Sequence, residues 1–180
     1  MFRELFMLRT VVLLIITLDD FFGFLKVTFR IRMNTERRIA AEIRNLLKEQ
    51  PPGILVEVNP ENNHHFFVTI DGPQNTPYEG GKFKLELFLT EKYPLEPPKA
   101  HMFTKIYHPN FDKLGRICLD ILKTEWTPIM NIETTVLSIQ SLMCEPCLVD
   151  PLDTTICQHF LTDPEGAKEV ARNWTREYAK

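Results

Sequence analysis

The chain has no excess of charge of one sign, few cysteines and no phosphate-binding glycine pattern. Its 24 acidic residues nearly balance its 21 basic ones, which argues against a surface shaped for nucleic acid. With only 4 cysteines in 180 residues, it does not resemble a small secreted disulfide scaffold, so we expect a reducing compartment, the cytoplasm or nucleus. The glycines at positions 72, 80 and 81 are not followed by Lys-Ser/Thr, so we expect no nucleotide, and no other cofactor, to be bound directly.

Residues 1–32 differ in composition from the rest of the chain. Their uncharged stretch, residues 10–18, has nine residues between Arg9 and Asp19, whereas a membrane-spanning helix needs roughly 20. A secretory signal stays open as an alternative, although Glu4 lies where such signals are basic and no small-x-small cleavage pattern follows. We predict an appendage over 1–32 that the mature protein need not contain, one compact domain over 33–180, and no association with membranes.

The domain begins with an amphipathic helix and continues with short strands. Asn34 or Thr35 can cap a helix that ends before Pro51-Pro52-Gly53. Its apolar residues at helical spacing are Ile39, Ile43, Leu46 and Leu47. Runs rich in strand-forming residues follow at 54–58, 66–70, 82–89 and 100–104, separated by turn signals. Four strands joined by short turns predict an antiparallel meander.

The run over 82–89 has a period of two. Alternation places Phe83, Leu85, Leu87 and Leu89 on one face, and Lys84, Glu86 and Phe88 on the other. A single exposed apolar residue such as Phe88 is ordinary. An aromatic residue beside a carboxylate is also what a protein interface uses, so both interpretations remain open on this pattern alone.

Two helices are predicted after the strands, which makes the fold class α+β. Apolar residues at helical spacing mark the first: Ile132, Val136, Ile139 and Met143. Asp163 caps the second and Pro164 starts it; its predicted buried stripe is Ala167, Val170, Ala171, Trp174 and Tyr178. Between strands and helices, residues 105–128 show little periodicity. A long irregular segment that is too apolar to be disordered is usually functional.

That irregular segment contains three motifs in order. They are His108-Pro109-Asn110, then Gly115-Arg116-Ile117-Cys118-Leu119, then Trp126-Thr127-Pro128. Together they resemble the active-site signature of ubiquitin-conjugating enzymes, and residues 93–98, Tyr-Pro-Leu-Glu-Pro-Pro, resemble a turn of that family. The likeness runs from about residue 35 to residue 178. Residues 107–110 and 112–123 most resemble the branch that works with an inactive conjugating-enzyme variant to build non-degradative ubiquitin chains.

The chemistry implied by this resemblance can be assigned to particular residues. A thiolate is a strong nucleophile and thioester sulfur a good leaving group, which suits Cys118 for accepting ubiquitin and passing it to a lysine amine. The resemblance makes the side-chain amide of Asn110 a donor to the oxyanion that forms during transfer. Asp120 is the candidate carboxylate for orienting the attacking amine as it loses its proton. His108 is expected to be structural.

The resemblance also implies partners. These are ubiquitin, a ubiquitin-activating enzyme that consumes the ATP, RING-type ligases, and an inactive conjugating-enzyme variant that forms a heterodimer; a part in DNA repair is expected with that branch. The positions matching the family's contacts with activating enzyme and ligases are Arg37, Arg38, Leu95, Thr127 and Pro128. Those matching its contacts with the variant are Glu86, Phe88 and Leu114, although His101 stands where an Arg is expected.

Residues 144–151, Cys-Glu-Pro-Cys-Leu-Val-Asp-Pro, depart from the family's usual Pro-Asn-Pro-Asp-Asp-Pro. Three alternatives to a conjugating enzyme stay open. Cys144, Cys147, Cys157 and His159 offer four ligands of zinc type, but their spacing is unusual and we predict no metal. A cysteine hydrolase could pair Cys118 with a histidine, yet no protease motif surrounds it. A non-catalytic ubiquitin-binding variant would lack the active cysteine that this chain has.

Overall fold

The computed structural model describes residues 32–180. The chain divides into two compact units, residues 1–38 and 39–180, and the fold described below is that of the second. The predicted appendage lies almost wholly outside the described residues, so its predicted boundary at residue 33 stays a prediction. Over residues 32–180, no helix has the length and apolar character needed to cross a membrane.

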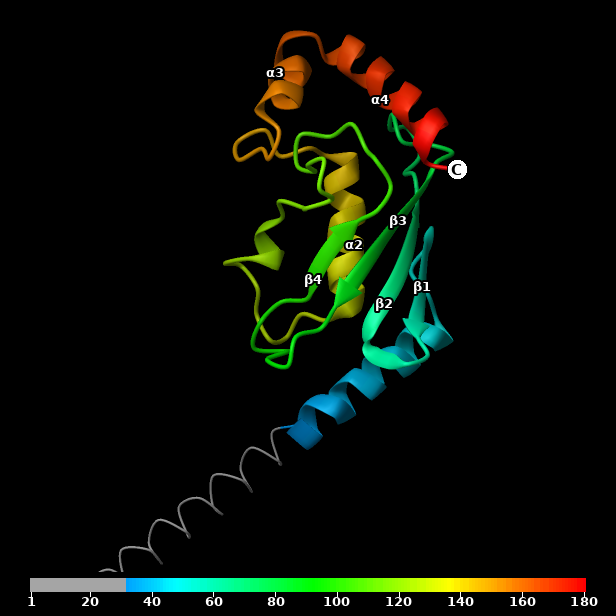
Figure 1. Cartoon of the computed structure of the whole chain (residues 1–180), viewed down its shortest axis with the longest axis vertical. Coiled ribbons are helices and arrows are strands. Elements are labelled where there is room, and N and C mark those ends of the chain that lie inside the picture. Colours follow the sequence, from blue (N-terminus) through cyan, green and yellow to red (C-terminus); the bar gives the residue numbers. More distant parts are fainter. Residues whose placement is uncertain (1–31) are drawn as a thin grey trace, which may run out of the picture. The chain divides into compact units, whose positions relative to one another are not determined.

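Four strands form one antiparallel sheet in the order β1-β2-β3-β4 (Figure 1). Their bounds are Ile54–Asn59 for β1, Asn62–Asp71 for β2, Lys82–Phe88 for β3 and Lys99–Met102 for β4. Each strand pairs with the next in sequence: Val56 lies opposite Val68, and Val68 opposite Leu85. The predicted meander is confirmed. The second strand starts at Asn62, earlier than predicted, because its polar first residues complete a tight turn with β1.

The period-two pattern of β3 gives the sheet one buried and one wet face. Phe83, Leu85 and Leu87 are fully buried, whereas Phe88 on the other face is 43% exposed. This outcome is the one expected for a strand that covers a core on one side only. The alternation therefore fixes which residues of the sheet can meet a partner.

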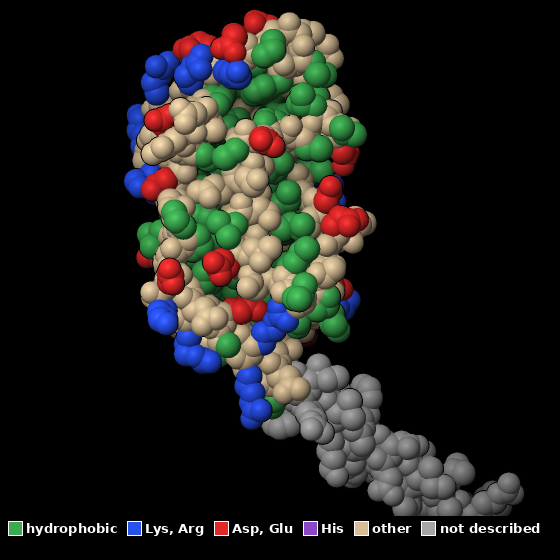
Figure 2. All heavy atoms as spheres, turned by 180° about the vertical axis from the view of Figure 1, so that it is seen from behind, with side chains coloured by type: hydrophobic (Ala, Val, Ile, Leu, Met, Phe, Trp, Pro, Cys, Tyr) green, Lys and Arg blue, Asp and Glu red, His purple; other side chains and the backbone are tan. Residues whose placement is uncertain are grey.

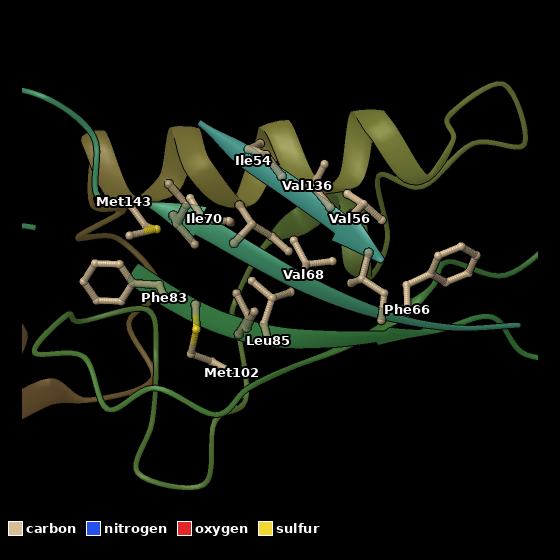
Figure 3. Close-up of a cluster of buried hydrophobic side chains, with 14 of the residues drawn as sticks. Ile54, Val56, Phe66, Val68, Ile70, Phe83, Leu85, Met102, Val136 and Met143 are labelled. Atoms are coloured by element: carbon tan, nitrogen blue, oxygen red, sulfur yellow. The ribbon is translucent and has the colours of Figure 1, made fainter. Parts of the chain in front are cut away.

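Helices complete the α+β fold. A helix covers residues 32–48, of which residues 39–48 belong to the second unit. Beyond the sheet lie a short 3₁₀ helix, η1 (Asp120–Leu122), and the helices α2 (Ile132–Cys144), α3 (Thr154–Thr162) and α4 (Pro164–Tyr178). Helix α2 lies across the buried face of the sheet (Figure 1), and Figure 3 shows its Val136 and Met143 facing the strand residues Val56, Ile70 and Phe83.

Glu42 connects three elements of this core. Its carboxylate accepts hydrogen bonds from the hydroxyl of Tyr93, at 2.7 and 2.9 Å, and from the backbone N–H of Ile132, at 3.1 Å. Tyr93 is buried in the turn that follows β3, and Ile132 is the first residue of α2. A carboxylate at a helix N-terminus satisfies an N–H group that has no partner within the helix. The helix over 39–48 is thereby held to α2 and to the turn.

Helix α4 carries its charged residues in pairs on the wet side. Lys168 lies 2.8 Å from Glu165, and Arg172 lies 2.8 Å from Glu169. In Figure 2, acidic and basic side chains gather at the top of the view, and apolar side chains lie next to them. Exposed pairs of this kind contribute little to stability and mainly keep the surface soluble.

Four expectations about the helices were wrong. The first helix already includes residues 32–35, so it does not begin after a cap at Asn34 or Thr35. Helix α3 was not predicted at all. Leu47 was placed on the buried stripe of the first helix but is 64% exposed, and Tyr178 was placed on that of the last helix but is 37% exposed. At the last helix the buried stripe runs through Ala167, Ala171 and Thr175 instead, because small residues allow the helix to approach the turn before β3, where Thr175 donates a hydrogen bond to the Pro77 carbonyl at 3.1 Å.

Candidate active site

A tight turn delivers Cys118 to its position. Phe111 pairs with Ile117 in an isolated antiparallel bridge, and between them the Asp112 carboxylate accepts hydrogen bonds from the N–H groups of Leu114 and Arg116, both at 2.9 Å. Gly115 has φ of +76°, and a Cβ there would lie 2.2 Å from the Met102 carbonyl oxygen. The motif glycine is therefore required by backbone conformation and by a close approach to β4.

The Cys118 sulfur lies between two charged side chains. Lys123 Nζ donates a hydrogen bond to Sγ at 2.9 Å, and Sγ lies 3.4 Å from Oδ2 of Asp150. The ammonium and carboxylate groups are themselves 3.8 Å apart. Cys118 as a whole is 6% exposed, whereas the Lys123 and Asp150 side chains beside its sulfur are 47% and 76% exposed.

Asn110 organises the loop beside this sulfur. Its side-chain Nδ2 donates to the Cys147 carbonyl, and its Oδ1 accepts from the Cys147 N–H, both at 2.8 Å. Its backbone carbonyl accepts from the N–H of Cys118 at 2.9 Å. Asn110 thus touches both sides of the site, but its amide donor is engaged by the loop, and acting on an oxyanion would require that bond to be exchanged.

His108 is buried and holds the backbone in place. Its Nε2 donates to the Leu142 carbonyl at 2.9 Å, which leaves Nδ1 to accept from the N–H of Asn110 at 3.0 Å. Burial lowers its pKa from 6.5 to about 4, against the opposing effect of the hydrogen bond to Leu142. A neutral ring with both nitrogens occupied has neither the proton affinity nor the free lone pair of a general base, which agrees with the structural role expected for it.

Asp120 is the first residue of η1, two residues beyond the cysteine. Its side chain is exposed, and its backbone carbonyl accepts from the N–H groups of Lys123 and Glu125, at 2.9 and 3.1 Å. This short turn carries Lys123 back toward the sulfur. The pKa of Lys123 is raised, first by its hydrogen bond to Cys118 and also by the nearby Asp150 and Asp120 carboxylates.

Sequence reasoning missed Lys123. The contact depends on the turn over residues 120–123, and nothing in the local pattern marks a lysine five residues after a cysteine as its neighbour. Asp150 lies in the altered loop over 144–151, and no role was predicted for it.

The altered loop, residues 144–151, is held in its middle by Asn110 and at its C-terminal end by Pro109, and most of its residues are exposed. The carbonyl of Pro109 accepts from the N–H groups of Leu152 and Asp153, at 2.8 and 3.0 Å. Val149, which replaces a family acid, is 94% exposed. The substitution therefore changes the charge at the rim of the site while leaving the loop anchored through Pro109 and Asn110.

The residues expected to meet the activating enzyme and ligases fall in two groups. Leu95, Thr127 and Pro128 are exposed on two loops that are joined by a hydrogen bond of 2.8 Å from Trp126 Nε1 to the Pro94 carbonyl. Arg37 is exposed and Arg38 half-buried on the helix over 32–48, in the other compact unit. The structure therefore brings the two loops together, whereas the two arginines belong to a separate compact unit.

The residues expected to meet a variant partner gather on the wet face of the sheet. Glu86 lies between two histidines: its Oε2 is 2.8 Å from Nε2 of His65, and its Oε1 is 3.6 Å from Nδ1 of His101. His101 donates from Nε2 to the Leu114 carbonyl at 2.8 Å. Leu114 and Phe88 are both exposed. Glu86 and Phe88 lie on the same face of β3, and His101 connects Glu86 to Leu114.

The geometry gives no support to the zinc and hydrolase alternatives. Within residues 32–180, no three His, Cys, Asp or Glu side chains are grouped so as to hold a metal ion, and all four cysteines are free thiols. All five histidines lie in this range, and each has a hydrogen-bond partner other than Cys118: Leu89 for His64, Glu86 for His65, Leu114 for His101, Leu142 for His108 and Tyr107 for His159.

Comparison with known proteins places this geometry in context. The profile of a family described as ubiquitin-conjugating enzyme matches residues 38–175. "Ubiquitin-conjugating enzyme E2 13" of Saccharomyces cerevisiae is 49% identical over 80% of this chain and 94% of that protein, and "Ubiquitin-conjugating enzyme E2 N" of Macaca fascicularis is 52% identical over 79% and 94%. A solved E2 domain of a Toxoplasma gondii ubiquitin-conjugating enzyme superposes with a TM-score of 0.75 at 36% identity, covering 81% of this chain and 99% of that one.

Proposed function

The chain belongs to the ubiquitin-conjugating enzyme family, and from this membership we propose that Cys118 is the residue on which it carries ubiquitin. Such an enzyme accepts ubiquitin from the activating enzyme as a thioester and transfers it to a lysine amine. The observation that carries the assignment is the environment of the sulfur: of the four free thiols, Cys118 is the one contacted by both an ammonium and a carboxylate group.

Transfer to lysine also needs a group that stabilises the oxyanion and a group that orients the attacking amine, and we assign these roles to Asn110 and Asp120. The amine nitrogen attacks the thioester carbonyl carbon, the C–S bond breaks, and the electron pair returns to sulfur. The oxyanion formed on the way needs a donor; Asn110 is hydrogen-bonded to Cys118 through its backbone carbonyl and to the loop through its side-chain amide, which is the donor we assign. The exposed Asp120 carboxylate can hold the incoming ammonium group as it loses its proton.

The partners of the family are ubiquitin, an activating enzyme and ligases. We assign the ligases to the RING type. We place contacts with the activating enzyme and ligases on Leu95, Thr127 and Pro128, and assign further contacts to Arg37 and Arg38 of the other compact unit. Leu95, Thr127 and Pro128 are exposed on two loops joined by the hydrogen bond from Trp126 to Pro94, so a partner can contact all three. ATP is consumed by the activating enzyme, and this chain binds no cofactor directly.

The finer assignment is to chain assembly with an inactive conjugating-enzyme variant. Support comes from the wet face of the sheet, where Phe88 and Leu114 expose apolar area beside the Glu86 carboxylate. An apolar anchor next to a charged group is typical of the centre of a protein interface. We place this activity in the cytoplasm and nucleus, with a part in DNA repair.

The assignment of Cys118 is tested by replacing each cysteine separately. Incubation with activating enzyme, ATP and ubiquitin should give a reductant-sensitive adduct in the wild type and in Cys144→Ser, Cys147→Ser and Cys157→Ser, but not in Cys118→Ala. Retention of the adduct in Cys118→Ala would move the thioester to another thiol. Absence of an adduct in every protein, including one that starts at Met33, would favour the non-catalytic variant.

A further inference from the structure

Lys123 is placed to act on the reacting sulfur itself. Its Nζ lies 2.9 Å from Sγ of Cys118 and 3.8 Å from Oδ2 of Asp150, which is in turn 3.4 Å from the same sulfur. The three groups form a triangle whose edges are all within the range of direct electrostatic interaction. The sequence included this lysine only as the last residue of the segment 112–123 that resembles one branch of the family, and the roles assigned to Cys118, Asn110 and Asp120 leave it without a function.

The position of Lys123 follows from the turn after the cysteine. The N–H of Leu122 donates to the Leu119 carbonyl and the N–H of Lys123 to the Asp120 carbonyl, both at 2.9 Å. These two bonds close η1 and reverse the chain so that a side chain five residues along returns to the sulfur. The side chain remains 47% exposed, so it can move aside when a bulky thioester occupies the site.

The contacts of Lys123 and Asp150 with the Cys118 sulfur differ between the thiol and the thiolate. In the neutral thiol, S–H donates to the Asp150 carboxylate. In the thiolate that donor is lost and two negative groups face each other across 3.4 Å, which is unfavourable unless a cation offsets it. Lys123 is the cation within hydrogen-bond distance of the sulfur.

We propose that Lys123 is a further catalytic residue, whose ammonium group stabilises negative charge on the Cys118 sulfur and is opposed by Asp150. This inference rests on the proposed function in that Cys118 is taken as the carrier. In charging, the Cys118 thiolate attacks the carbonyl carbon of the activating enzyme's thioester, a new C–S bond forms, and the activating enzyme's thiolate leaves. In transfer, the amine attacks, the C–S bond to Cys118 breaks, its electron pair returns to the sulfur beside Lys123, and the proton lost by the amine passes to solvent.

In charging, the thiolate of this sulfur is the attacking form; in transfer, negative charge develops on the same sulfur as the C–S bond breaks. A contact that strengthens as charge develops lowers the barrier, whereas a contact equal in both states does not. Because Lys123 and Asp150 reach solvent, the effect is screened, and we expect about threefold to tenfold on each rate rather than the larger factors of enclosed sites.

The test measures the sulfur before any ubiquitin is present and again after charging. In the full chain, Lys123→Gln, Lys123→Arg and Asp150→Asn are compared with the wild type and with Lys168→Gln, a lysine paired with Glu165 on α4. The first readout is the rate at which iodoacetamide alkylates Cys118 near neutral pH, followed on the Cys118 peptide by mass spectrometry. The second is single-turnover discharge of the Cys118 thioester onto free lysine.

The proposal predicts that Lys123→Gln slows both alkylation and discharge about threefold to tenfold, that Lys123→Arg retains most of both, and that Asp150→Asn speeds alkylation. Lys168→Gln should match the wild type. Unchanged alkylation in Lys123→Gln, or equal losses in the Gln and Arg variants, would overturn it. If the wild type forms no thioester on Cys118, the proposed function fails. The alkylation rates would still show whether Lys123 affects the reactivity of the Cys118 sulfur.

Discussion

The side chain of Asn110 and the backbone of Cys147 form a closed pair of hydrogen bonds, each 2.8 Å long. This pair fastens the loop over 144–151 to the strand-like segment that carries the active sulfur. The loop differs from that of the family at several positions, but an attachment through backbone atoms is insensitive to side-chain identity. The attachment therefore explains how the sequence of the loop can change while the loop stays beside Cys118.

Replacing Asn110 should separate anchoring of the loop from transfer. Asn110→Asp keeps an acceptor for the Cys147 N–H but loses the donor to its carbonyl, so we expect faster hydrogen exchange over residues 145–150. Discharge onto lysine should fall about 100-fold, the size typical of losing one oxyanion donor, with a smaller effect on charging. Asn173→Ala, outside the site on α4, is the control. A normal discharge rate in Asn110→Asp would remove Asn110 from the mechanism.

The buried, neutral His108 should make stability depend on pH. Its folded pKa of about 4 lies below the ordinary value of 6.5, so protons bind the unfolded chain more readily. The stabilisation is complete above pH 6.5 and is lost as the pH falls toward 4, by about 3 kcal/mol in total. Urea unfolding at several pH values measures it.

The matched variant is His108→Gln, whose amide can still donate to the Leu142 carbonyl. It should be less stable than the wild type at neutral pH, and the gap should narrow between pH 6.5 and 4 because Gln does not titrate. Parallel stability profiles of the two proteins would mean that the His108 ring is not held neutral.

Truncation of Phe88 should weaken the proposed heterodimer without affecting thioester chemistry. Removing an aromatic anchor from the centre of an interface typically costs more than tenfold in affinity. We therefore expect Phe88→Ala to lower the affinity for the inactive conjugating-enzyme variant by at least about tenfold, measured by titration calorimetry, with charging of Cys118 unchanged. Leu55→Ala, an exposed apolar residue on β1 of the same face, is the control; equal losses in both would point to a general effect on the sheet.

The connections made by Glu42 should matter for stability. Glu42→Ala removes the carboxylate that accepts from the buried Tyr93 hydroxyl and from the Ile132 N–H, and the loss of these bonds should cost about 2–3 kcal/mol. Glu42→Gln keeps one carbonyl oxygen and should lose less. Thermal or urea unfolding checks both against Glu49→Ala, an exposed residue of the same type. A loss of less than about 0.5 kcal/mol in Glu42→Ala, the range of ordinary surface changes, would refute the role of this contact.

The sheet could be predicted from the sequence because its pattern is local. Alternation in β3 separates Leu85 and Leu87 from Glu86 and Phe88, and neighbouring strands follow each other without crossovers. Helix α3 could not be predicted in this way. It has nine residues and buries only Ile156 and Cys157, which is too few for a helical period to emerge. Its start is set by Asp153, whose carboxylate accepts from the Ile156 N–H at 2.9 Å.

In the active site, too, residues that belong to local motifs could be predicted, and residues that act through contacts formed on folding could not. Cys118 and Asn110 belong to contiguous motifs, so the sequence identifies them together. Lys123 and Cys147 matter through tertiary contacts: one returns through the turn of η1, and the other offers only its backbone to Asn110. Leu47 was wrongly predicted to be buried. Its spacing fits the apolar face of the helix, but Leu46 occupies the buried position and Leu47 lies at the exposed edge of that face.

The central claim, that the sulfur of Cys118 carries ubiquitin, is tested most directly by the chemistry of the adduct. The protein is incubated with activating enzyme, ATP and ubiquitin, and its intact mass is measured before and after reductant. We predict one added ubiquitin that reductant removes from the wild type, and an added ubiquitin that reductant does not remove from Cys118→Ser, because an oxygen ester resists thiols. A wild-type adduct that survives reductant, or no adduct on a folded chain, would contradict the account.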